Sequence, residues 1–525
     1  MIRVRQVKLP IEDKDLLKKV SKILKVNQNT IKKIRIVKKS LDARKKDNLL
    51  FVYELDVEID KEEIFLKRNK SKDIFKIEEE NYKFEISGQH KLEKRPIIIG
   101  SGPAGLYCAY LLAEHGFRPI VIERGECVEK RIKTVEEFWK SGKLNPNSNV
   151  QFGEGGAGTF SDGKLNTSVK DRENRIKKVL EIFVENGAPE EILYEAKPHI
   201  GTDILRNVVR NIRNKIISFG GEFRYSTTLT DLEIENGKIK SIELNHKETL
   251  ECETLVLAIG HSARDTFKML IEKKLKITSK PFAVGVRVEH LQKMINKSQY
   301  GVEYSKYLSP ASYKLTYTTK TGRGVYSFCM CPGGYVVNAS SEEGLLAVNG
   351  MSNYNRDSKN ANSALVVTVN AKDFGENPLD GLEFQRKLEK LAYESCNGKI
   401  PIQLYKDFKN NTLSTSLGEV NPCTKGEYSF TNLNDILPNY ITDSLKEAIE
   451  VFGKAINGYN RGDTILLGVE SRTSSPIRIV RNDEFTSNIE GIYPCGEGAG
   501  YAGGITTAAI DGIKVAEAIA KKYYV

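Results

Sequence analysis

The feature that most constrains this chain is a glycine turn between an apolar strand and a helix. Residues 96–99 read Pro-Ile-Ile-Ile, without polar alternation, which is typical of a strand buried on both faces of a parallel sheet. The turn Gly100–Gly105 follows, then a helical stretch over 106–115 and a second strand over 119–123. This order predicts the strand–helix–strand unit of a parallel α/β sheet.

The glycines of this turn match G-x-G-x-x-G, a weak signal alone but a stronger one between a strand and a helix. Gly100 permits the tight turn, Gly102 lets a pyrophosphate approach the backbone, and Gly105 lets the helix pack closely on the strand. The first N–H groups of the helix and its dipole attract phosphate. Glu123, at the end of the second strand, can accept hydrogen bonds from a ribose. The unit therefore predicts a dinucleotide site.

A segment near the C-terminus favours FAD over NAD. Residues 487–497 read as a strand ending in Gly496-Glu497, followed by a glycine-rich turn over 498–504 and a helix from about Ile505. In FAD oxidoreductases such a strand usually ends in Gly-Asp, whose acid binds the ribityl chain, and the next helix points at the isoalloxazine ring. Glu497 is one methylene longer but keeps this hydrogen-bonding capacity. A nicotinamide dehydrogenase does not need this distant segment, so we predict non-covalently bound FAD.

Six longer segments carry a resemblance to a known family. They are SNVQFGEGGAGTFSDGKL (148–165), AIGHSARDTF (258–267), YSFCMCPGG (326–334), NGMS (349–352), ESRTSSP (470–476) and YPCGEGAGYAGGITTAAIDG (493–512). Through them the chain resembles the bacterial uncharacterised FAD-dependent dehydrogenases, which are NAD(P)/FAD-dependent oxidoreductases. The resemblance implies a glutathione-reductase-like FAD fold of the p-hydroxybenzoate-hydroxylase-like type, in which a β-meander and one Rossmann unit surround FAD. It implies no particular substrate.

A second glycine-rich stretch, residues 153–158, also spells G-x-G-x-x-G. No apolar strand precedes it, so we interpret it as a loop lying over the flavin or its pyrophosphate. Lys164, just beyond, can counter phosphate charge or the N1 side of a reduced flavin. The residues predicted to bind FAD are Gly100, Gly102, Pro103, Ala104, Gly105, Glu123, Arg124, Arg131, Gly155, Gly156, Gly158, Ser161, Asp162, Lys164, Gly260, Gly496, Glu497, Gly503, Gly504, Ile505 and Thr506.

No motif indicates a separate NAD(P)H domain, because the sequence has no second G-x-G-x-x-G between a strand and a helix. Enzymes of the glutathione-reductase type carry such a domain. We therefore expect the flavin to be reduced either by NAD(P)H visiting the same face or by a protein electron donor.

The catalytic candidates lie outside the glycine segments. Cys329 and Cys331 are two positions apart, so in a strand both thiols can face the flavin, as redox partners or proton donors. The alternative is that they are small hydrophobic residues packed before a Pro-Gly-Gly turn. His261 and His199 are candidates for acid–base work. Three arginines, Arg264, Arg287 and Arg472, are candidates to bind an acidic substrate through two hydrogen bonds each. Of these, Arg472 is the predicted catalytic residue.

The first 90 residues read as a separate basic α+β module. Residues 1–50 hold 16 Lys and Arg against 5 Asp and Glu, whereas the whole chain carries +11. Strands are predicted over 2–7, 31–37 and 49–59, with a helix over 13–24. Such a segment can meet nucleic acid or an acidic partner. Because no aromatic residues interleave with the basic ones, we favour a Lys-rich solvated surface over a nucleic-acid site, and keep a protein partner or electron donor as the alternative.

The chain's 525 residues predict more than one domain. We expect the basic module over 1–90, an FAD-binding domain over 96–265 together with 485–525, and a mixed α+β substrate or cap domain over 266–484. No apolar run reaches the roughly 18–20 residues that span a bilayer. The eight cysteines show no C-x-x-C spacing, so we predict no metal site. We also expect a soluble, cytoplasmic protein without a membrane partner.

The sequence thus predicts an α/β fold with a Rossmann-type FAD domain and a β-meander. The predicted function is an FAD-dependent oxidoreductase that transfers a hydride between flavin N5 and a small organic substrate, with NAD(P)H as a candidate donor. Two alternatives stay open at this point. One is an FAD-dependent RNA-modifying enzyme, and the other is a flavin electron-transfer protein that acts with a protein partner.

Overall fold

A parallel sheet forms the centre of the FAD-binding region in the computed structural model, which describes residues 1–78 and 81–525. Its strand order is β25-β12-β6-β7-β8, and every neighbouring pair is parallel. The buried Ile97–Ile99 strand lies in the middle, as its unbroken apolar sequence predicts. The strands are β6 (Ile97–Ile99), β7 (Ile120–Ile122), β8 (Glu222–Arg224), β12 (Leu255–Leu257) and β25 (Ile492–Pro494).

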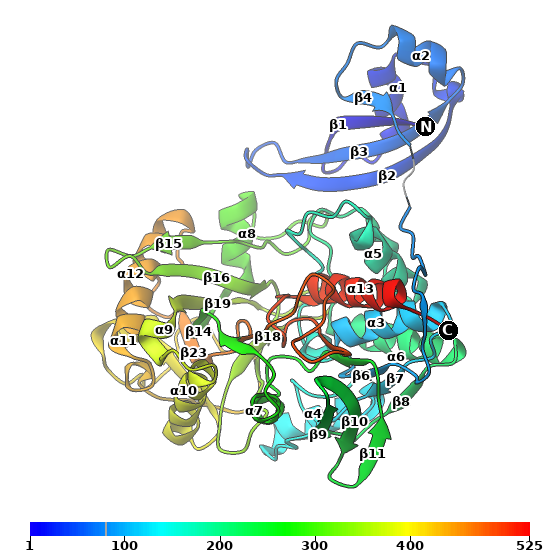
Figure 1. Cartoon of the computed structure of the whole chain (residues 1–525). Coiled ribbons are helices and arrows are strands. Elements are labelled where there is room, and N and C mark those ends of the chain that lie inside the picture. Colours follow the sequence, from blue (N-terminus) through cyan, green and yellow to red (C-terminus); the bar gives the residue numbers. More distant parts are fainter. Residues whose placement is uncertain (79–80) are drawn as a thin grey trace.

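Helices α3 (Pro103–Glu114) and α13 (Ile505–Lys522) pack side by side against this sheet (Figure 1). Both are buried over most of their length. Close approach depends on Gly512, where a Cβ atom would lie 2.1 Å from the carbonyl oxygen of Ala104. The remaining helices of this region are α4 (Val128–Ser141), η2 (Ala157–Phe160), α5 (Arg175–Glu185), η3 (Glu190–Leu193) and α6 (Thr202–Ser218).

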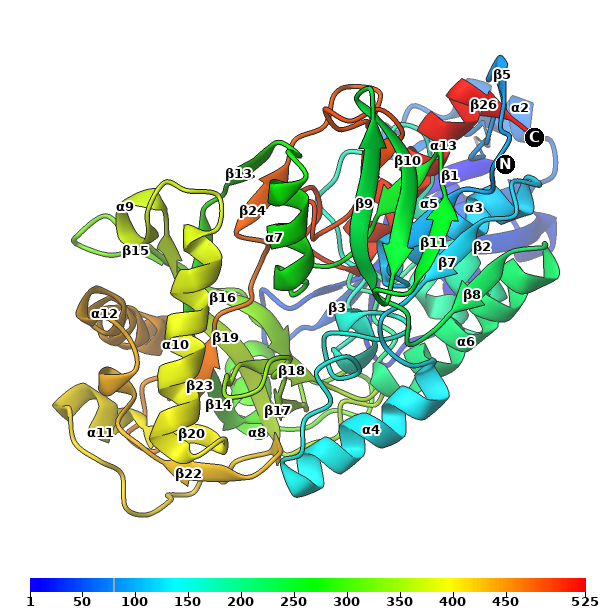
Figure 2. The ribbon, with the colours of Figure 1, turned by 60° about the horizontal axis from the view of Figure 1, so that its bottom comes forward.

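A three-stranded antiparallel meander lies over the parallel sheet (Figure 2). It consists of β9 (Leu229–Glu235), β10 (Lys238–Leu244) and β11 (Glu248–Glu251), with a turn between the first two of these strands. The stretch that begins at Glu222 is not part of it, because β8 pairs with β7 at the edge of the parallel sheet. Helix α7 (Arg264–Glu272) and the pair β13 (Ile277–Ser279) and β24 (Ile477–Ile479) share the apolar core of the meander. These elements fall in the range expected for the cap.

The cap is built on a seven-stranded sheet of order β15-β16-β19-β14-β23-β20-β22. Its central strands, β14 and β19, are buried almost from end to end. The strands are β14 (Phe282–Leu291), β15 (Thr316–Thr318), β16 (Gly324–Cys331), β19 (Asn360–Val369), β20 (Ile400–Leu404), β22 (Tyr428–Phe430) and β23 (Ile465–Glu470). A small sheet of β17 (Tyr335–Asn338), β18 (Val348–Met351) and β21 (Thr424–Lys425) adjoins it.

Helices complete the cap and share a core with its sheet. They are α8 (Gln292–Tyr300), α9 (Ala371–Phe374), α10 (Asp380–Cys396), α11 (Tyr405–Asn410), η4 (Leu433–Asp435) and α12 (Asn439–Ala455).

The basic N-terminal segment folds as a four-stranded sheet, order β2-β3-β1-β4, with its own core (Figure 1). It contacts the FAD-binding region through Lys39, whose N–H donates to the Tyr194 carbonyl at 2.7 Å and whose Nζ lies 2.8 Å from Glu195. Its elements are β1 (Ile2–Pro10), α1 (Leu16–Leu24), η1 (Gln28–Thr30), β2 (Ile31–Asp42), β3 (Leu50–Ile59), α2 (Glu62–Arg68) and β4 (Ile74–Lys76). The following segment pairs β5 (His90–Lys91) with β26 (Tyr523–Tyr524).

The predicted fold class, α/β with a Rossmann-type domain, a meander, a mixed cap and an N-terminal module, is confirmed. No helix within residues 1–78 and 81–525 has the length and apolar content needed to cross a bilayer.

The packing of α3 on α13 generates a test at Gly512. Gly512→Ala places a methyl group against the Ala104 carbonyl, which the backbone cannot avoid without moving. Overpacking of this kind costs about 1–3 kcal/mol and outweighs the gain in helix propensity, so we expect a lower midpoint in thermal unfolding. Gly324→Ala on β16, where the nearest atom lies 3.4 Å away, is the matched control and should change the midpoint little. An unchanged midpoint for Gly512→Ala contradicts the close packing.

Candidate functional site

A cavity of about 390 Å³ lies between the parallel sheet and the cap. The glycine turn after β6, the loop over 151–166, the turn after β12 and the start of α13 form one side of it. The end of β16 and the chain around Asn349 and Glu470 form the other. Segments that are hundreds of residues apart therefore meet at one site.

The glycine turn presents the N-terminus of α3 to this cavity. Gly100 has a φ of +100°, which favours glycine, and a Cβ atom on Gly105 would lie 1.9 Å from the Gly100 carbonyl oxygen. Gly102 is the N-cap, and no side chain caps the helix there. Gly102, Pro103 and Ala104 all line the cavity. The first N–H groups of α3 can therefore receive a phosphate.

Glu123 holds the glycine turn in place from the end of β7. One carboxylate oxygen accepts the Ser101 N–H at 2.9 Å and the Ser101 hydroxyl at 2.7 Å. The other accepts the N–H groups of Gly125 at 2.9 Å and Gly153 at 3.0 Å. Glu123 lines the cavity next to Arg124. The residue predicted to bind the ribose therefore also connects the two glycine segments to each other.

The loop over 153–158 is not a second Rossmann turn, because it leads into the short helix η2 and follows no strand. Gly156 and Gly158 line the cavity, and a Cβ atom on Gly156 would lie 3.0 Å from Cα of Gly102. Arg131, predicted to bind FAD, lies behind the loop and does not line the cavity. Its guanidinium donates to the carbonyls of Asn149, Val150, Gly153, Glu154 and Gly156.

The C-terminal segment supplies a second helix N-terminus. Gly503, Gly504 and Ile505 line the cavity, and no side chain caps α13 at Gly504. Glu497 lines it too, and its carboxylate lies 3.1 Å from Nδ1 of His261.

Other predicted FAD residues divide into those that face the cavity and those that support it. Thr506 faces away, since its hydroxyl donates to the Leu165 carbonyl at 2.8 Å. Ser161, Asp162, Lys164 and Gly260 line the cavity. Gly105, Gly155 and Gly496 are outside its lining and act through close packing.

These residues fit an extended dinucleotide. Two uncapped helix N-termini, α3 and α13, open on one cavity, and glycines at Gly102 and Gly156 leave its floor free of side chains. His261 adds a buried Nε2 atom that has no hydrogen-bond partner among the described residues. An unpartnered polar atom beside the glycine segments is what a missing ligand would satisfy.

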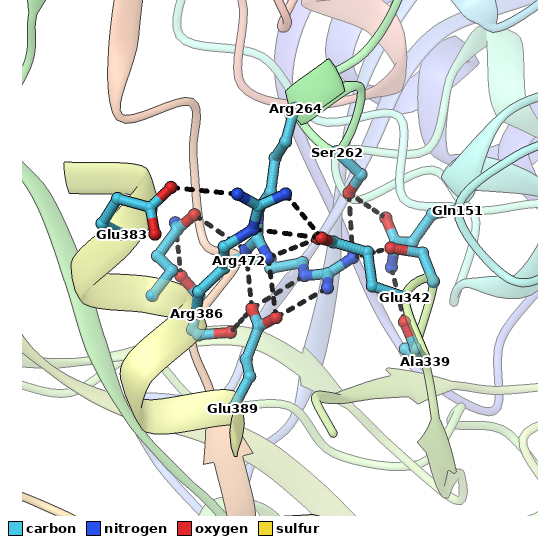
Figure 3. Close-up of polar contacts among 12 residues, drawn as sticks. Gln151, Ser262, Arg264, Ala339, Glu342, Glu383, Arg386, Glu389 and Arg472 are labelled. Carbon is cyan, nitrogen blue, oxygen red and sulfur yellow. Dashed lines mark hydrogen bonds and ion pairs between the residues drawn. The ribbon is translucent and has the colours of Figure 1, made fainter. Parts of the chain in front are cut away.

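A hydrogen-bonded chain of side chains forms the cap-facing wall, and Figure 3 shows its part from Arg472 through Ser262 to Gln151. Arg472 donates to the Ser262 hydroxyl at 3.1 Å, and Ser262 donates to Gln151 at 3.3 Å. Gln151 donates to Asn349 at 3.0 Å, and Asn349 donates to Glu470 at 3.0 Å. All five residues line the cavity, and together they join the FAD-binding region to the cap.

Behind this wall a buried carboxylate, Glu389 of α10, binds two arginines (Figure 3). Arg264 contacts it at 2.8 Å and Arg472 also at 2.8 Å. Burial opposes the charge, but the two guanidinium groups prevail and hold the pKa of Glu389 far below its usual range. Glu342 lies 2.7 Å from Arg264, and its carboxylate offsets part of the positive charge that Glu389 leaves unbalanced.

The three arginines expected to bind an acidic substrate instead bind groups of the protein itself. Arg264 is engaged by Glu389 and Glu342, and Arg287 by Glu470 at 3.1 Å, and neither lines the cavity. Arg472 lines the cavity, but its donors are directed at Glu389, Ser262 and Ser341, which makes it a positioning residue.

The histidine and cysteine candidates also divide. His261 and Cys329 line the cavity, whereas His199 and Cys331 do not. His199 stacks on Tyr354, and its Nε2 lies 3.0 Å from the carbonyl oxygen of that residue. Cys329 has a φ of +44°, and the neighbouring Cys331 thiol, together with the positive charges of Lys164 and Arg287, lowers its pKa.

Glu470 is a site residue that sequence reasoning missed. It is almost fully buried, it lines the cavity, and burial raises its pKa to about 7 despite the nearby Arg287. It belongs to the ESRTSSP segment, and Asn349 belongs to the NGMS segment, so the segments that carry the resemblance mark both.

Three stretches of the chain match known families. Residues 94–278 match the family described as pyridine nucleotide-disulphide oxidoreductase. Residues 281–473 match the one described as FAD-dependent protein, C-terminal domain-like. Residues 1–58 match a domain of unknown function.

A protein of Clostridium beijerinckii (strain ATCC 51743 / NCIMB 8052), described as an uncharacterized protein, is 50% identical over 530 residues, which cover 99% of each chain. The chain belongs to the same family as this protein. The matches over residues 94–278 and 281–473 of this chain support an FAD-dependent oxidoreductase.

Solved structures with some similarity include L-proline dehydrogenase from P. horikoshii, with 14% identity over 83% of this chain and 95% of that chain and a TM-score of 0.34. Another is glycine oxidase from Bacillus cereus ATCC 14579, with 12% identity over 81% and 94% of the two chains and a TM-score of 0.30.

The role of Glu123 can be tested by Glu123→Gln. The amide turns one acceptor into a donor that faces N–H groups, so we expect the glycine turn to loosen and the protein to lose about 1–3 kcal/mol of stability. FAD retained after gel filtration should fall as well. Glu248→Gln, on the exposed strand β11, is the control and should change neither quantity. Full FAD retention by Glu123→Gln is incompatible with this role.

The Glu389 cluster predicts a specific pH dependence. Glu389→Gln leaves two buried arginines without their carboxylate, which should cost about 3–5 kcal/mol at neutral pH. Because the folded-state pKa is lowered, wild-type Glu389 stabilises above the unfolded-state value of about 4.3 and loses that effect as pH falls toward the folded-state pKa. Urea unfolding should therefore show the two proteins converging below about pH 4. Glu383→Gln, on the exposed side of the same helix, should match wild type at every pH, and a constant gap would contradict the assignment.

Proposed function

We propose that this FAD-dependent oxidoreductase transfers a hydride between flavin N5 and a small organic substrate in the cavity under the cap. We further propose NAD(P)H as the electron donor, reaching the flavin from the same face. The observation that carries the proposal is the meeting of two uncapped helix N-termini, α3 and α13, with titratable cap residues in one cavity.

The FAD-binding region would hold the cofactor in an extended form. The N-terminus of α3 and Gly156 would receive the pyrophosphate, and Glu123 would accept the adenosine ribose hydroxyls. Glu497 and the N-terminus of α13 would hold the ribityl chain and the ring system. Bound FAD supplies the two-electron chemistry.

The chain's own residues supply the proton and exclude water. Cys329, Glu470 and His261 line the cavity and can each hold or release a proton there. The buried pairs of Arg472 and Arg264 with Glu389 fix the wall that carries Ser262. The cap sheet covers this side of the cavity, which favours transfer of a hydride over loss of reducing equivalents to solvent.

The shared-face donor follows from the parallel sheets. Among residues 1–78 and 81–525, one sheet of five parallel strands carries a glycine turn of the dinucleotide kind. A separate NAD(P)H domain would require another. The donor would therefore use the same cavity before the substrate does.

The first measurement is the visible spectrum of the purified protein under anaerobic conditions, before and after mixing with NADPH. A flavin spectrum that bleaches, more slowly with NADPH deuterated at the transferred position, supports FAD as the cofactor and NADPH as its hydride donor. A flavin spectrum that persists rejects NADPH and moves the search to NADH, a reducing substrate or a protein donor. A protein that is colourless and takes up no FAD overturns the proposal itself.

A further inference from the structure

Cys329 and Cys331 lie at the end of strand β16, on the cap side of the cavity. The pairing of β16 with β19 changes register between Phe328 and Cys331, and Cys329 takes a φ of +44° at this bulge. A non-glycine residue in the left-handed region costs free energy and often marks a functional position. The bulge turns Cys329 into the cavity while Cys331 stays fully buried behind it.

Positive charge surrounds the two sulfurs. Arg287 donates to the Cys329 carbonyl at 2.5 Å, and Lys164 donates to the Met330 carbonyl. Cys331 donates its own hydrogen bond to the Cys329 carbonyl at 3.4 Å, which places its sulfur beside the backbone of Cys329. This environment stabilises a thiolate on Cys329.

Cysteines used only for packing look different in this protein. Cys108 and Cys495 are buried between α3, α13 and the parallel sheet, and burial raises the pKa of each. Cys252 lies in the meander core, and burial raises its pKa to about 12. A pair kept for volume alone would not need a strained backbone and two cations.

We propose that Cys329 and Cys331 form a reversible dithiol–disulfide couple that exchanges two electrons with FAD bound in the cavity. Oxidation forms one S–S bond, removes the proton of the Cys331 thiol, and passes two electrons from the two sulfurs to oxidised FAD. The reverse step returns the electrons and restores the thiolate and thiol. The inference rests on the proposed function for its electron acceptor and extends it, because a thiol or disulfide compound then becomes the expected class of substrate.

The first test reads the sulfurs directly and does not require turnover. Trypsin releases residues 324–356 as one peptide, which holds Cys329 and Cys331 and no other cysteine. The full-length holoprotein is equilibrated anaerobically in glutathione buffers of rising potential, treated with iodoacetamide and digested. The mass of the peptide is then measured by mass spectrometry. We expect a two-electron transition from a doubly alkylated peptide to one that is lighter by two hydrogens and takes no label. A peptide that stays doubly alkylated at every potential overturns the proposal.

The second test counts electrons in a dithionite titration of the holoprotein. Wild type should take up twice as many electrons per FAD as Cys329→Ser or Cys331→Ser, while Cys423→Ser, at a half-buried cysteine of the cap outside the cavity, should match wild type. Equal uptake by wild type and both serine variants overturns the couple. The FAD absorbance separates the two levels of failure: absorbance with equal uptake rejects only the cysteine couple, whereas its absence in wild type rejects the proposed function.

Discussion

One buried carboxylate, Glu389, keeps the two halves of the site together. It lies on α10 of the cap and binds Arg264, at the start of α7 next to the meander, and Arg472, just after β23. Each arginine would be costly to bury alone, and the carboxylate between them offsets that cost. Ser262 and Gln151 take their positions from this cluster, so the shape of the cavity wall depends on it.

The FAD-binding half could be predicted from the sequence because its signals are local. The Ile97–Ile99 strand, the glycine turn and Glu123 lie within one strand–helix–strand unit, where spacing fixes geometry. The C-terminal segment after Gly496 adds a second local signal. The resemblance also implied the meander, whereas β8, just before it in the chain, pairs with β7 in the parallel sheet.

The cap side could not be predicted in the same way, since its contacts join distant residues. Arg264 and Arg287 have the sequence context of substrate clamps, but Glu389 and Glu470, more than a hundred residues away, engage them. Arg131 presented the same difficulty, because its buried donors hold a loop of backbone carbonyls that no spacing rule links to it. Charge alone does not reveal whether an arginine faces a ligand or the protein.

The bulge at Cys329 shows how a local rule can give the wrong geometry for two neighbouring residues. Alternation along a strand places positions 329 and 331 on one face, which would turn both thiols toward the cavity. The register change instead directs Cys329 into the cavity and leaves Cys331 beneath it. This arrangement suits a couple better than two exposed thiols would, since one sulfur is open to a reaction partner while the other is shielded from solvent. In the proposed couple, the strained backbone of Cys329 presents one reactive sulfur to the cavity, and Cys331 stays buried beside it.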